Sequence, residues 1–492
     1  MQSSMFNVRV PLDQTAADGD VFLLNTFTDA QLVVGHDVAA LLDRLADGIA
    51  PADGAAFTDD ERDAISTLAE HGFVVESRAA ERQRLEAFFR DVHEGSDQLR
   101  ITVLTTLQCN FACDYCIQGD HGDYNRTAAK MSLETADRVA TWAEERMDVV
   151  RPSSFVLTFF GGEPLLNLPV VYYLAERLWT SSTQRGIHMQ INVITNGLLI
   201  TPEVVDRLEP FGLNGFKITL DGDRATHNRM RPLRGGQGTF DRIIGNIRKI
   251  AGRCAISLGG NFDESSVASY PALLDFLASQ EFAPRISRVA FKPVIRDVKP
   301  SVAAGFEERP KTSAANKFIA LTPVTDGNPL NGTCMTSAGM GTSAGACDTC
   351  HFLDDQMAFL RDETRKRGFK TSDGVHMGPC EIHRKHAYTI GPEGDLYACP
   401  GFTGDRKMST GHIDGRSDAA RSSAARRFDR LAAWKECRDC AFIPVCAGGC
   451  TVASHSELGD MNAPNCHKKS FEAGVASMAR DAAATLVPEL VN

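Results

Sequence analysis

The chain has 492 residues, 43% of them hydrophobic and 23% charged, which is typical of folded domains and is long enough for two or three of them. No run of roughly 18 apolar residues predicts a membrane span, and the first residues lack the basic and then apolar pattern of a signal peptide. In the reducing cytoplasm that this indicates, fourteen cysteines are expected to hold metal rather than to form disulfides.

The net charge of −11 lies entirely in residues 1–100, which contain 19 acidic and 8 basic residues, whereas the rest of the chain contains 44 of each. Such a stretch is either a solvated surface or a docking surface for something basic. Because no basic stripe occurs, we expect no nucleic-acid partner, and the missing span gives no reason to expect a membrane partner.

Residues 1–98 are predicted to form a small α+β domain with its linker. Strands are expected at 21–25 and 31–35, a helix at 36–45, and a closing strand at 73–75. Thr58 followed by Glu61 predicts a capped helix through Leu68, and the polar stretch from Arg78 to Arg100 predicts a helical linker.

Residues 99–299 alternate between strand and helix patterns, which predicts a parallel β/α architecture, either an open sheet or a barrel. Helices are expected at 132–149 and 201–211. The expected strands are 101–107, 155–160, 189–194, 216–220, 255–259 and 288–291. Active sites of such folds lie on the loops after the strands.

The remaining chain divides into a bridging region, 300–379, and a cysteine-rich domain, 380–492. The bridging region contains a Gly/Ser/Thr-rich loop at 325–346 and a predicted helix at 351–367. A terminal helix is expected at 472–486.

The first cysteine group follows the first predicted barrel strand, where Cys109, Cys113 and Cys116 have the spacing C-x3-C-x2-C. Structural zinc sites and closed iron–sulfur clusters both require four protein ligands, so three cysteines leave one iron of a 4Fe–4S cluster open. The alternative is a zinc knuckle completed by His121.

This spacing, with Tyr115 in the aromatic position before the last cysteine, resembles the radical S-adenosylmethionine (SAM) superfamily. The resemblance implies a partial (β/α)6 barrel in which SAM chelates the open iron and is cleaved to a 5′-deoxyadenosyl radical that abstracts hydrogen from the substrate. It also implies SAM contacts at matching positions after successive strands. These positions are Tyr115, Gly161, Gly162, Glu163, Asn196, Thr219 and Arg231, with Glu163 toward the amino group and Arg231 toward the carboxylate. Taken singly, the Gly-Gly-Glu and Thr-Asn-Gly segments are equally consistent with ordinary turns.

Seven further cysteines resemble the SPASM extension of radical SAM enzymes, which holds two auxiliary 4Fe–4S clusters. In the family's interleaved pattern, one cluster has four ligands and the other has three. The four are Cys437, Cys440, Cys446 and Cys466, and the three are Cys380, Cys399 and Cys450. Cys347 or Cys350 is a possible eighth ligand; otherwise these two face the substrate, are inert or form a redox disulfide. Cys254 is expected in the core.

The first 98 residues resemble the winged-helix peptide-recognition domain of ribosomal-peptide maturases, which binds a leader peptide as an added strand. The alternative is a cap that only covers the barrel. The resemblance therefore implies an oxidoreductase with SAM and three 4Fe–4S clusters that crosslinks a precursor peptide, with flavodoxin or ferredoxin as electron donor.

Two alternatives compete with a peptide-crosslinking enzyme. Sulfatase-maturing members form formylglycine and place Asp after the second SPASM cysteine, but Cys399 is followed by Pro400. A zinc-binding scaffold is the non-enzymatic alternative.

Overall fold

The computed structural model describes residues 1–12, 19–48, 57–116, 128–294, 348–371 and 379–486. Within these residues the largest sheet has the strand order β11-β10-β9-β8-β7-β6-β12-β13-β14. Its strands are β6 (Gln98–Leu104), β7 (Ser154–Phe160), β8 (His188–Thr195), β9 (Leu213–Thr219), β10 (Ala255–Phe262), β11 (Ile286–Pro293), β12 (Ala387–Ile390), β13 (Asp395–Tyr397) and β14 (Gly411–His412). Strands β6 to β11 are parallel neighbours in chain order, which confirms the predicted α/β architecture with a parallel sheet.

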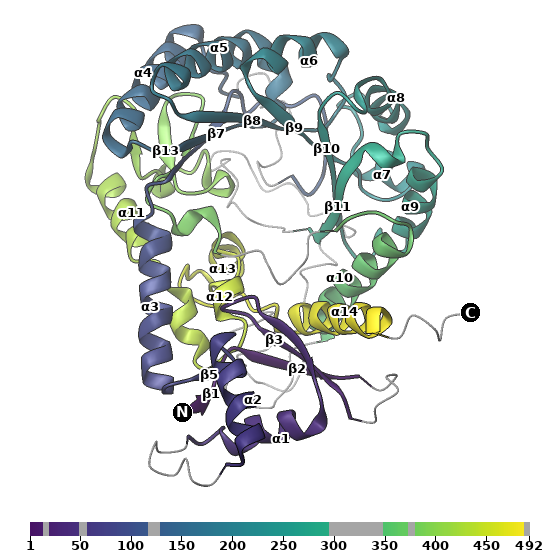
Figure 1. Ribbon diagram of the computed structural model, residues 1–492. Helices are drawn as coiled ribbons and strands as arrows, with labels where there is room; N and C mark the ends of the chain where they lie inside the picture. Colours follow the sequence, from purple (N-terminus) through teal and green to yellow (C-terminus); the bar gives the residue numbers. More distant parts are fainter. Residues whose placement is uncertain (13–18, 49–56, 117–127, 295–347, 372–378, 487–492) are drawn as a thin grey trace, which may run out of the picture.

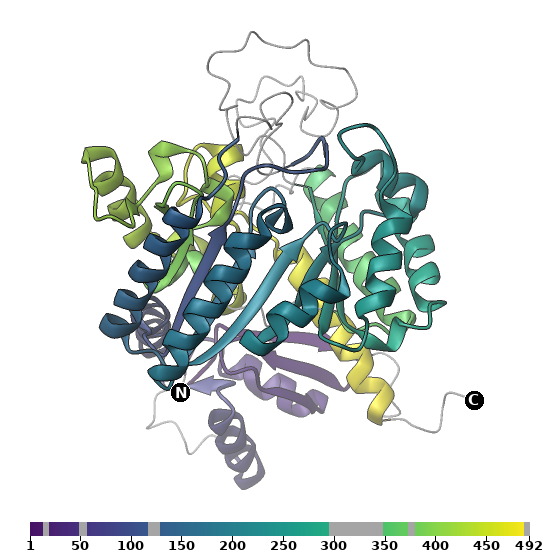
Figure 2. The same ribbon diagram turned by 90° about the horizontal axis from the view of Figure 1, so that it is seen from above.

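Helices cover the outer face of this curved sheet (Figures 1 and 2). They are α4 (Leu133–Val150), α5 (Leu168–Gln184), α6 (Pro202–Leu208), α7 (Arg224–Met230), α8 (Phe240–Ile250) and α9 (Tyr270–Ala278). Alternate strand residues such as Phe155, Leu157 and Phe159 are fully buried against them. The sheet has two ends, β11 and β14, so it forms an open arc rather than a closed barrel.

Local signals set several helix starts as expected. Ser132 accepts a hydrogen bond from the backbone of α4, and Thr201 does the same for α6, in which Pro202 is the first residue. The predicted helix 201–211 is a shorter α-helix followed by a 3₁₀ turn. The predicted loop 325–346 lies outside the described residues.

The linker prediction was wrong at its end. Helix α3 (Arg78–Glu94) stops at Glu94, and strand β6 begins at Gln98 rather than at Ile101. The polar residues Gln98 and Arg100 join the sheet because β7 and β12 flank β6 on both sides, so tertiary pairing outweighs a weak local strand signal. The parallel pairing of β12 with β6 was not predicted.

The amino-terminal region contains a three-stranded antiparallel sheet, β2 (Asn7–Pro11), β3 (Val21–Asn25) and β4 (Gln31–Val34), and a two-stranded pair, β1 (Gln2–Ser3) and β5 (Val74–Val75). Its helices are α1 (His36–Arg44) and α2 (Asp59–Glu70). The predicted capping box is present, because Glu61 N donates to Thr58 Oγ1 at 3.2 Å and Thr58 N donates to Glu61 Oε2 at 2.8 Å. Strands β1 and β2 were missed.

The carboxy-terminal helices are α10 (Asp348–Lys366), α11 (Ala419–Asp429), α12 (Ile443–Cys446), α13 (Thr451–Leu458) and α14 (Lys468–Leu486). Helix α14 lies beside β2 and β3 in both views of the molecule (Figures 1 and 2). Phe22 and Leu24 of β3 share one buried apolar cluster with Phe442, Phe471 and Val475. The amino-terminal three-stranded sheet therefore packs against helix α14.

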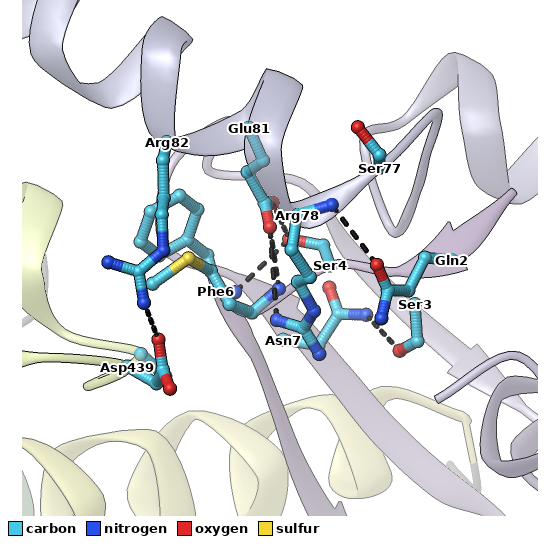
Figure 3. Close-up of polar contacts among 12 residues, drawn as sticks. Gln2, Ser3, Ser4, Phe6, Asn7, Ser77, Arg78, Glu81, Arg82 and Asp439 are labelled. Atoms are coloured by element: carbon cyan, nitrogen blue, oxygen red, sulfur yellow. Dashed lines mark hydrogen bonds and ion pairs between the residues drawn. The ribbon is translucent and has the colours of Figure 1, made fainter. Parts of the chain in front are cut away.

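Helix α3 connects the start of the chain to the cysteine-rich region (Figure 3). The Glu81 side chain is only 2% exposed and accepts hydrogen bonds from Met5 N, at 2.9 Å, and from the Ser4 hydroxyl. One residue further along, Arg82 forms an ion pair with Asp439, which lies between Cys437 and Cys440.

Candidate active site and cysteine groups

The first cysteine group lies at the carboxyl end of β6, as its position after the strand predicts. Cys109 is buried, and its Sγ accepts a hydrogen bond from Phe111 N at 3.4 Å. Burial raises the pKa of Cys109 to about 12, and the negative charges of Glu163, Cys113 and Cys116 add to this effect. Burial also raises the pKa of Cys113 to about 12, against the opposing effect of Arg231. At this buried position the thiolates of the three cysteines need a bound cation to stabilise their charge, and the irons of an iron–sulfur cluster would supply it.

Gly161 and Gly162 are required by a close backbone approach. Gly162 N donates to Thr106 O at 2.9 Å, so the loop after β7 packs directly on the segment that leads into Cys109. A Cβ at Gly161, whose φ is +140°, would lie 2.2 Å from Thr106 O, and one at Gly162 would lie 2.3 Å from Gln108 O. Larger residues would separate the two loops.

The Glu163 carboxylate is fully buried and bonded to neighbouring loops. Oε1 accepts from Leu165 N at 3.0 Å, Oε2 accepts from Asn196 N at 2.8 Å, and the Thr195 hydroxyl donates to both oxygens. Burial raises its pKa, although these hydrogen bonds oppose the shift. The side chain therefore joins the ends of β7 and β8.

Asn196 connects the end of β8 to the cysteine loop. Its Nδ2 donates to Asn110 Oδ1 at 2.7 Å and lies 3.9 Å from Cys109 Sγ, while its Oδ1 accepts from Leu198 N. Thr219 is the last residue of β9, level with Gly259 of β10 in the sheet register.

Tyr115 and Arg231 meet in a buried polar network. Arg231 Nη1 donates to Tyr115 Oη at 2.5 Å, the Tyr115 hydroxyl donates to Asp221, and Arg231 lies 3.6 Å from the Asp221 carboxylate. Asn261 completes the group: its N donates to Asp221 Oδ1 at 2.8 Å and its Nδ2 to Tyr115 Oη at 3.3 Å. Burial raises the pKa of Asp221, and Arg231 opposes the rise.

Sequence reasoning missed Asp221 and Asn261. Asp221 lies two residues after Thr219, which was predicted to contact SAM, but its role depends on the distant Tyr115. Asn261 has no local motif, and only its place at the end of β10 could have indicated it.

The second cysteine group surrounds a pocket. Four thiols line it, those of Cys437, Cys440, Cys446 and Cys466, together with Phe442, Ile443, Gly448, Pro464, Lys468 and Phe471. Burial raises the pKa of Cys437 and of Cys446 to about 12, and the charges of the other thiols in the group contribute. This is the set of four that the resemblance to the SPASM extension implies, and a pocket lined by thiols fits a cluster site.

The third group contains Cys380, Cys399 and Cys450. Burial raises the pKa of Cys399 to about 12, and the nearby charges of Cys380 and Cys450 add to it. Cys399 Sγ also accepts from Gly401 N at 3.4 Å. The possible eighth ligands, Cys347 and the side chain of Cys350, lie outside the described part of the chain. Cys334 and His121 also lie outside it.

Among the described residues, no three His, Cys, Asp or Glu side chains have the spacing that a single metal ion requires. None of the helices formed by these residues is long and apolar enough to cross a bilayer. Cys254 is half-buried and packs against the main apolar core, as expected.

Residues 103–255 match the family model described as the radical SAM superfamily. The chain therefore contains a radical SAM domain.

Among curated proteins, the AdoMet-dependent heme synthase of Methanosarcina barkeri (strain Fusaro / DSM 804) is 30% identical over 147 residues, which cover 29% of this chain and 36% of that protein. The chain spans between 36% and 41% of the length of four of the curated relatives that it matches, this heme synthase among them. The mycofactocin maturase MftC of Mycobacterium tuberculosis (strain ATCC 25618 / H37Rv) is 25% identical over 369 residues, 71% of this chain and 77% of that protein.

Among solved structures, anSMEcpe with bound AdoMet has a TM-score of 0.52 at 14% identity and covers 80% of this chain and 100% of that one. This likeness supports the fold.

Proposed function

We propose that this protein is a radical SAM enzyme that modifies a ribosomally synthesised peptide, forming a thioether, carbon–carbon or carbon–oxygen crosslink. The observation that carries the proposal is the similarity to the mycofactocin maturase, because it extends over 369 residues, far beyond the domain at 103–255. The three groups of cysteines support it.

In this proposal, Cys109, Cys113 and Cys116 hold the SAM-binding 4Fe–4S cluster, which when bound supplies the electron that cleaves SAM. The other two groups would hold the auxiliary clusters of a SPASM domain. Gly161 and Gly162 let the loop after β7 pack directly on the segment that leads into Cys109, so the Gly-Gly-Glu segment lies beside the proposed SAM site.

The buried network orients the groups proposed to contact SAM. Arg231 is a cation held beside Tyr115 and Asp221, so its guanidinium can bind the SAM carboxylate while the network fixes its direction. Glu163 already accepts three donors from the protein, so its main effect here is to hold the loops that carry Asn196.

Residues 1–98 are proposed to recruit a net-basic leader peptide as an added strand. Strand β4 is an edge strand whose only described neighbour is β3. Asn25 N donates to Ala30 O, so in the alternating antiparallel pattern the N–H of Gln31 points away from β3, toward an added strand. The acidic charge of this region would steer a basic leader to it.

The metal content tests the enzyme proposal. Anaerobically reconstituted protein should contain about twelve iron atoms, from three four-iron clusters, and should cleave SAM when reduced by flavodoxin or ferredoxin. Replacing Cys109, Cys113 and Cys116 with Ala should remove about four irons and abolish SAM cleavage. Cys254→Ala is the matched control and should keep both. Stoichiometric zinc, or reductive SAM cleavage by the triple variant, would refute the assignment.

The product distinguishes crosslinking from formylglycine formation. A short peptide encoded beside this gene, co-expressed with the protein, should become two hydrogen atoms lighter and should yield linked fragments by tandem mass spectrometry. Conversion of serine to formylglycine causes the same loss, but it creates an aldehyde that reacts with an aminooxy probe. A reactive aldehyde without linked fragments would favour the alternative.

Leader recruitment is tested at the strand edge. Gln31→Pro removes the outward N–H and should weaken binding of the leader several-fold, whereas Gln31→Ala, which keeps that N–H, should not. Binding should also weaken with added salt. Equal binding by both variants would contradict strand addition at β4, and binding that ignores salt would contradict the charge argument.

A further inference from the structure

Three positive side chains lie on the inner face of the arc of strands. The inner face is the side of the sheet away from the helices (Figure 1). In β9 the flanking residues Phe216 and Ile218 belong to the buried core, so Lys217 between them lies on this inner face. In β11, Val289 is buried and Phe291 packs on Tyr270 of α9, so Arg288 and Lys292 also face inward. We call Lys217, Arg288 and Lys292 the cationic row.

The members of the cationic row are close together. A Cβ at Gly259 of β10 would lie 3.4 Å from Lys217 Cε, so the lysine side chain crosses β10 at this glycine. Gly259 is paired with Ala290, the inward residue between Arg288 and Lys292. All three side chains are exposed. Partial loss of hydration within the arc lowers the pKa of Lys217 to about 8, and the positive charges of Lys292 and Arg288 lower it further.

The cationic row makes no ion pair within the described residues, whereas Arg231 in the adjoining candidate active site is paired with Asp221. Like charges that gather without an anion repel one another, and the arrangement is relieved when an anion binds. The missing side chain at Gly259 gives Lys217 room to extend across β10 toward β11.

The cationic row also adjoins the candidate active site. Lys292 is level with Asn261, which bonds to Tyr115 and Asp221, and Lys217 lies two residues before Thr219 on the same face of β9. A group bound to the cationic row would therefore lie next to the candidate active site, toward the amino-terminal ends of strands β9 to β11.

We propose that the cationic row binds a carboxylate of the peptide substrate, either an acidic side chain or the free carboxyl terminus, and thereby positions the residue to be modified. This inference rests on the proposed function, and it assigns an anionic core to the same peptide whose leader is basic. The carboxylate of SAM is the competing anion, and the test separates the two.

The test uses the reconstituted full chain and fluorescein-labelled ten-residue peptides of Gly and Ala that carry three Glu and an amidated terminus. A second peptide replaces Glu with Gln, and a third is the Gln peptide with a free carboxyl terminus. Fluorescence anisotropy should show that the Glu peptide or the free-acid peptide binds at least about tenfold more tightly than the amidated Gln peptide. The better binder identifies the source of the carboxylate.

Lys217→Met and Lys292→Met should each weaken the favoured peptide by about three- to tenfold and leave the amidated Gln peptide unchanged, which also reports an intact fold. Lys249→Met, on the outer helix α8, is the matched control and should have no effect. Equal affinity for all three peptides, or an equal loss in the Lys249 variant, would overturn the inference. Loss of SAM binding by Lys217→Met in equilibrium dialysis without peptide would assign the row to SAM and overturn it as well. Neither result depends on catalysis, so a failed peptide modification is a separate outcome.

Discussion

Replacing Glu163 with Gln should destabilise the radical SAM domain, although the two side chains have nearly the same shape. Each carboxylate oxygen accepts one backbone N–H, from Leu165 at 3.0 Å and from Asn196 at 2.8 Å. In either orientation, the amide NH₂ of Gln would therefore face a backbone donor. No rotation of the side chain avoids this conflict.

The magnitude follows from the bonds involved. The substitution removes one charge-assisted hydrogen bond, worth about 1.5–3 kcal/mol, and leaves a buried N–H without an acceptor, at a cost of about 1–3 kcal/mol. A neutral amide is easier to bury than the carboxylate, whose pKa is raised by burial, and this offsets part of the loss. We expect a net destabilisation of about 2–4 kcal/mol.

Urea unfolding of the chain checks this value. Trp142 in α4 and Trp179 in α5 report on the domain by fluorescence, and the first transition should move by about 1 M urea. Glu145→Gln, at an exposed position of α4, is the matched control and should change stability by less than about 0.5 kcal/mol. If Glu163→Gln unfolds at the same urea concentration as the control, the two backbone hydrogen bonds do not contribute as argued.

Three other outcomes are expected. Deletion of residues 1–95 should lower the iron content and the solubility, because it removes several apolar side chains that pack against α12 and α14. Burial of each such side chain contributes about 1.5–3 kcal/mol to stability. A soluble truncated chain with full iron content would contradict this expectation. Gly449→Ala should reduce the iron content, because its Cβ would lie 1.8 Å from Asn465 O. The control Gly459→Ala, also at positive φ but with no neighbour within 4 Å, should lower the free energy of unfolding by only about 1–2 kcal/mol. Equal iron contents in the two variants would refute the steric argument. The rate at which Lys217 reacts with amine reagents should have its midpoint near pH 8, because the neutral amine predominates above the pKa. The unfolded chain binds this proton more tightly, so the contribution of Lys217 to the free energy of unfolding rises as pH increases from 8 toward 10.5. A midpoint above about pH 10, measured by mass spectrometry of the labelled protein, would contradict the lowered pKa.

The truncation result bears on what the amino-terminal region does. Sequence analysis predicted a separate domain at residues 1–98. In the structure, Phe6 and Phe89 share an apolar cluster with Ile443, and Cys437 and Cys440 pack against the same cluster. Point substitutions on the edge of β4 therefore test leader recruitment more cleanly than a deletion does.

The sequence by itself determined the features that depend on local spacing. Cys109, Cys113 and Cys116 lie on one short loop, so their closeness in the sequence is enough to bring the three thiols together. The alternation of strands and helices likewise predicted the parallel sheet, and the Thr58–Glu61 capping box is a contact between residues three positions apart.

Only the tertiary structure decided the contacts between distant segments. The network of Tyr115, Asp221 and Asn261 joins the cysteine loop, the loop after β9 and strand β10, and β12 pairs with a strand nearly 300 residues before it. Strands such as β1, with two residues, carry too little local signal to be recognised, because their pairing energy comes from partners far along the chain. The inward direction of Lys217 has the same origin: the curvature of the sheet turns this face of β9 toward the inside of the arc, where the lysine side chain remains exposed.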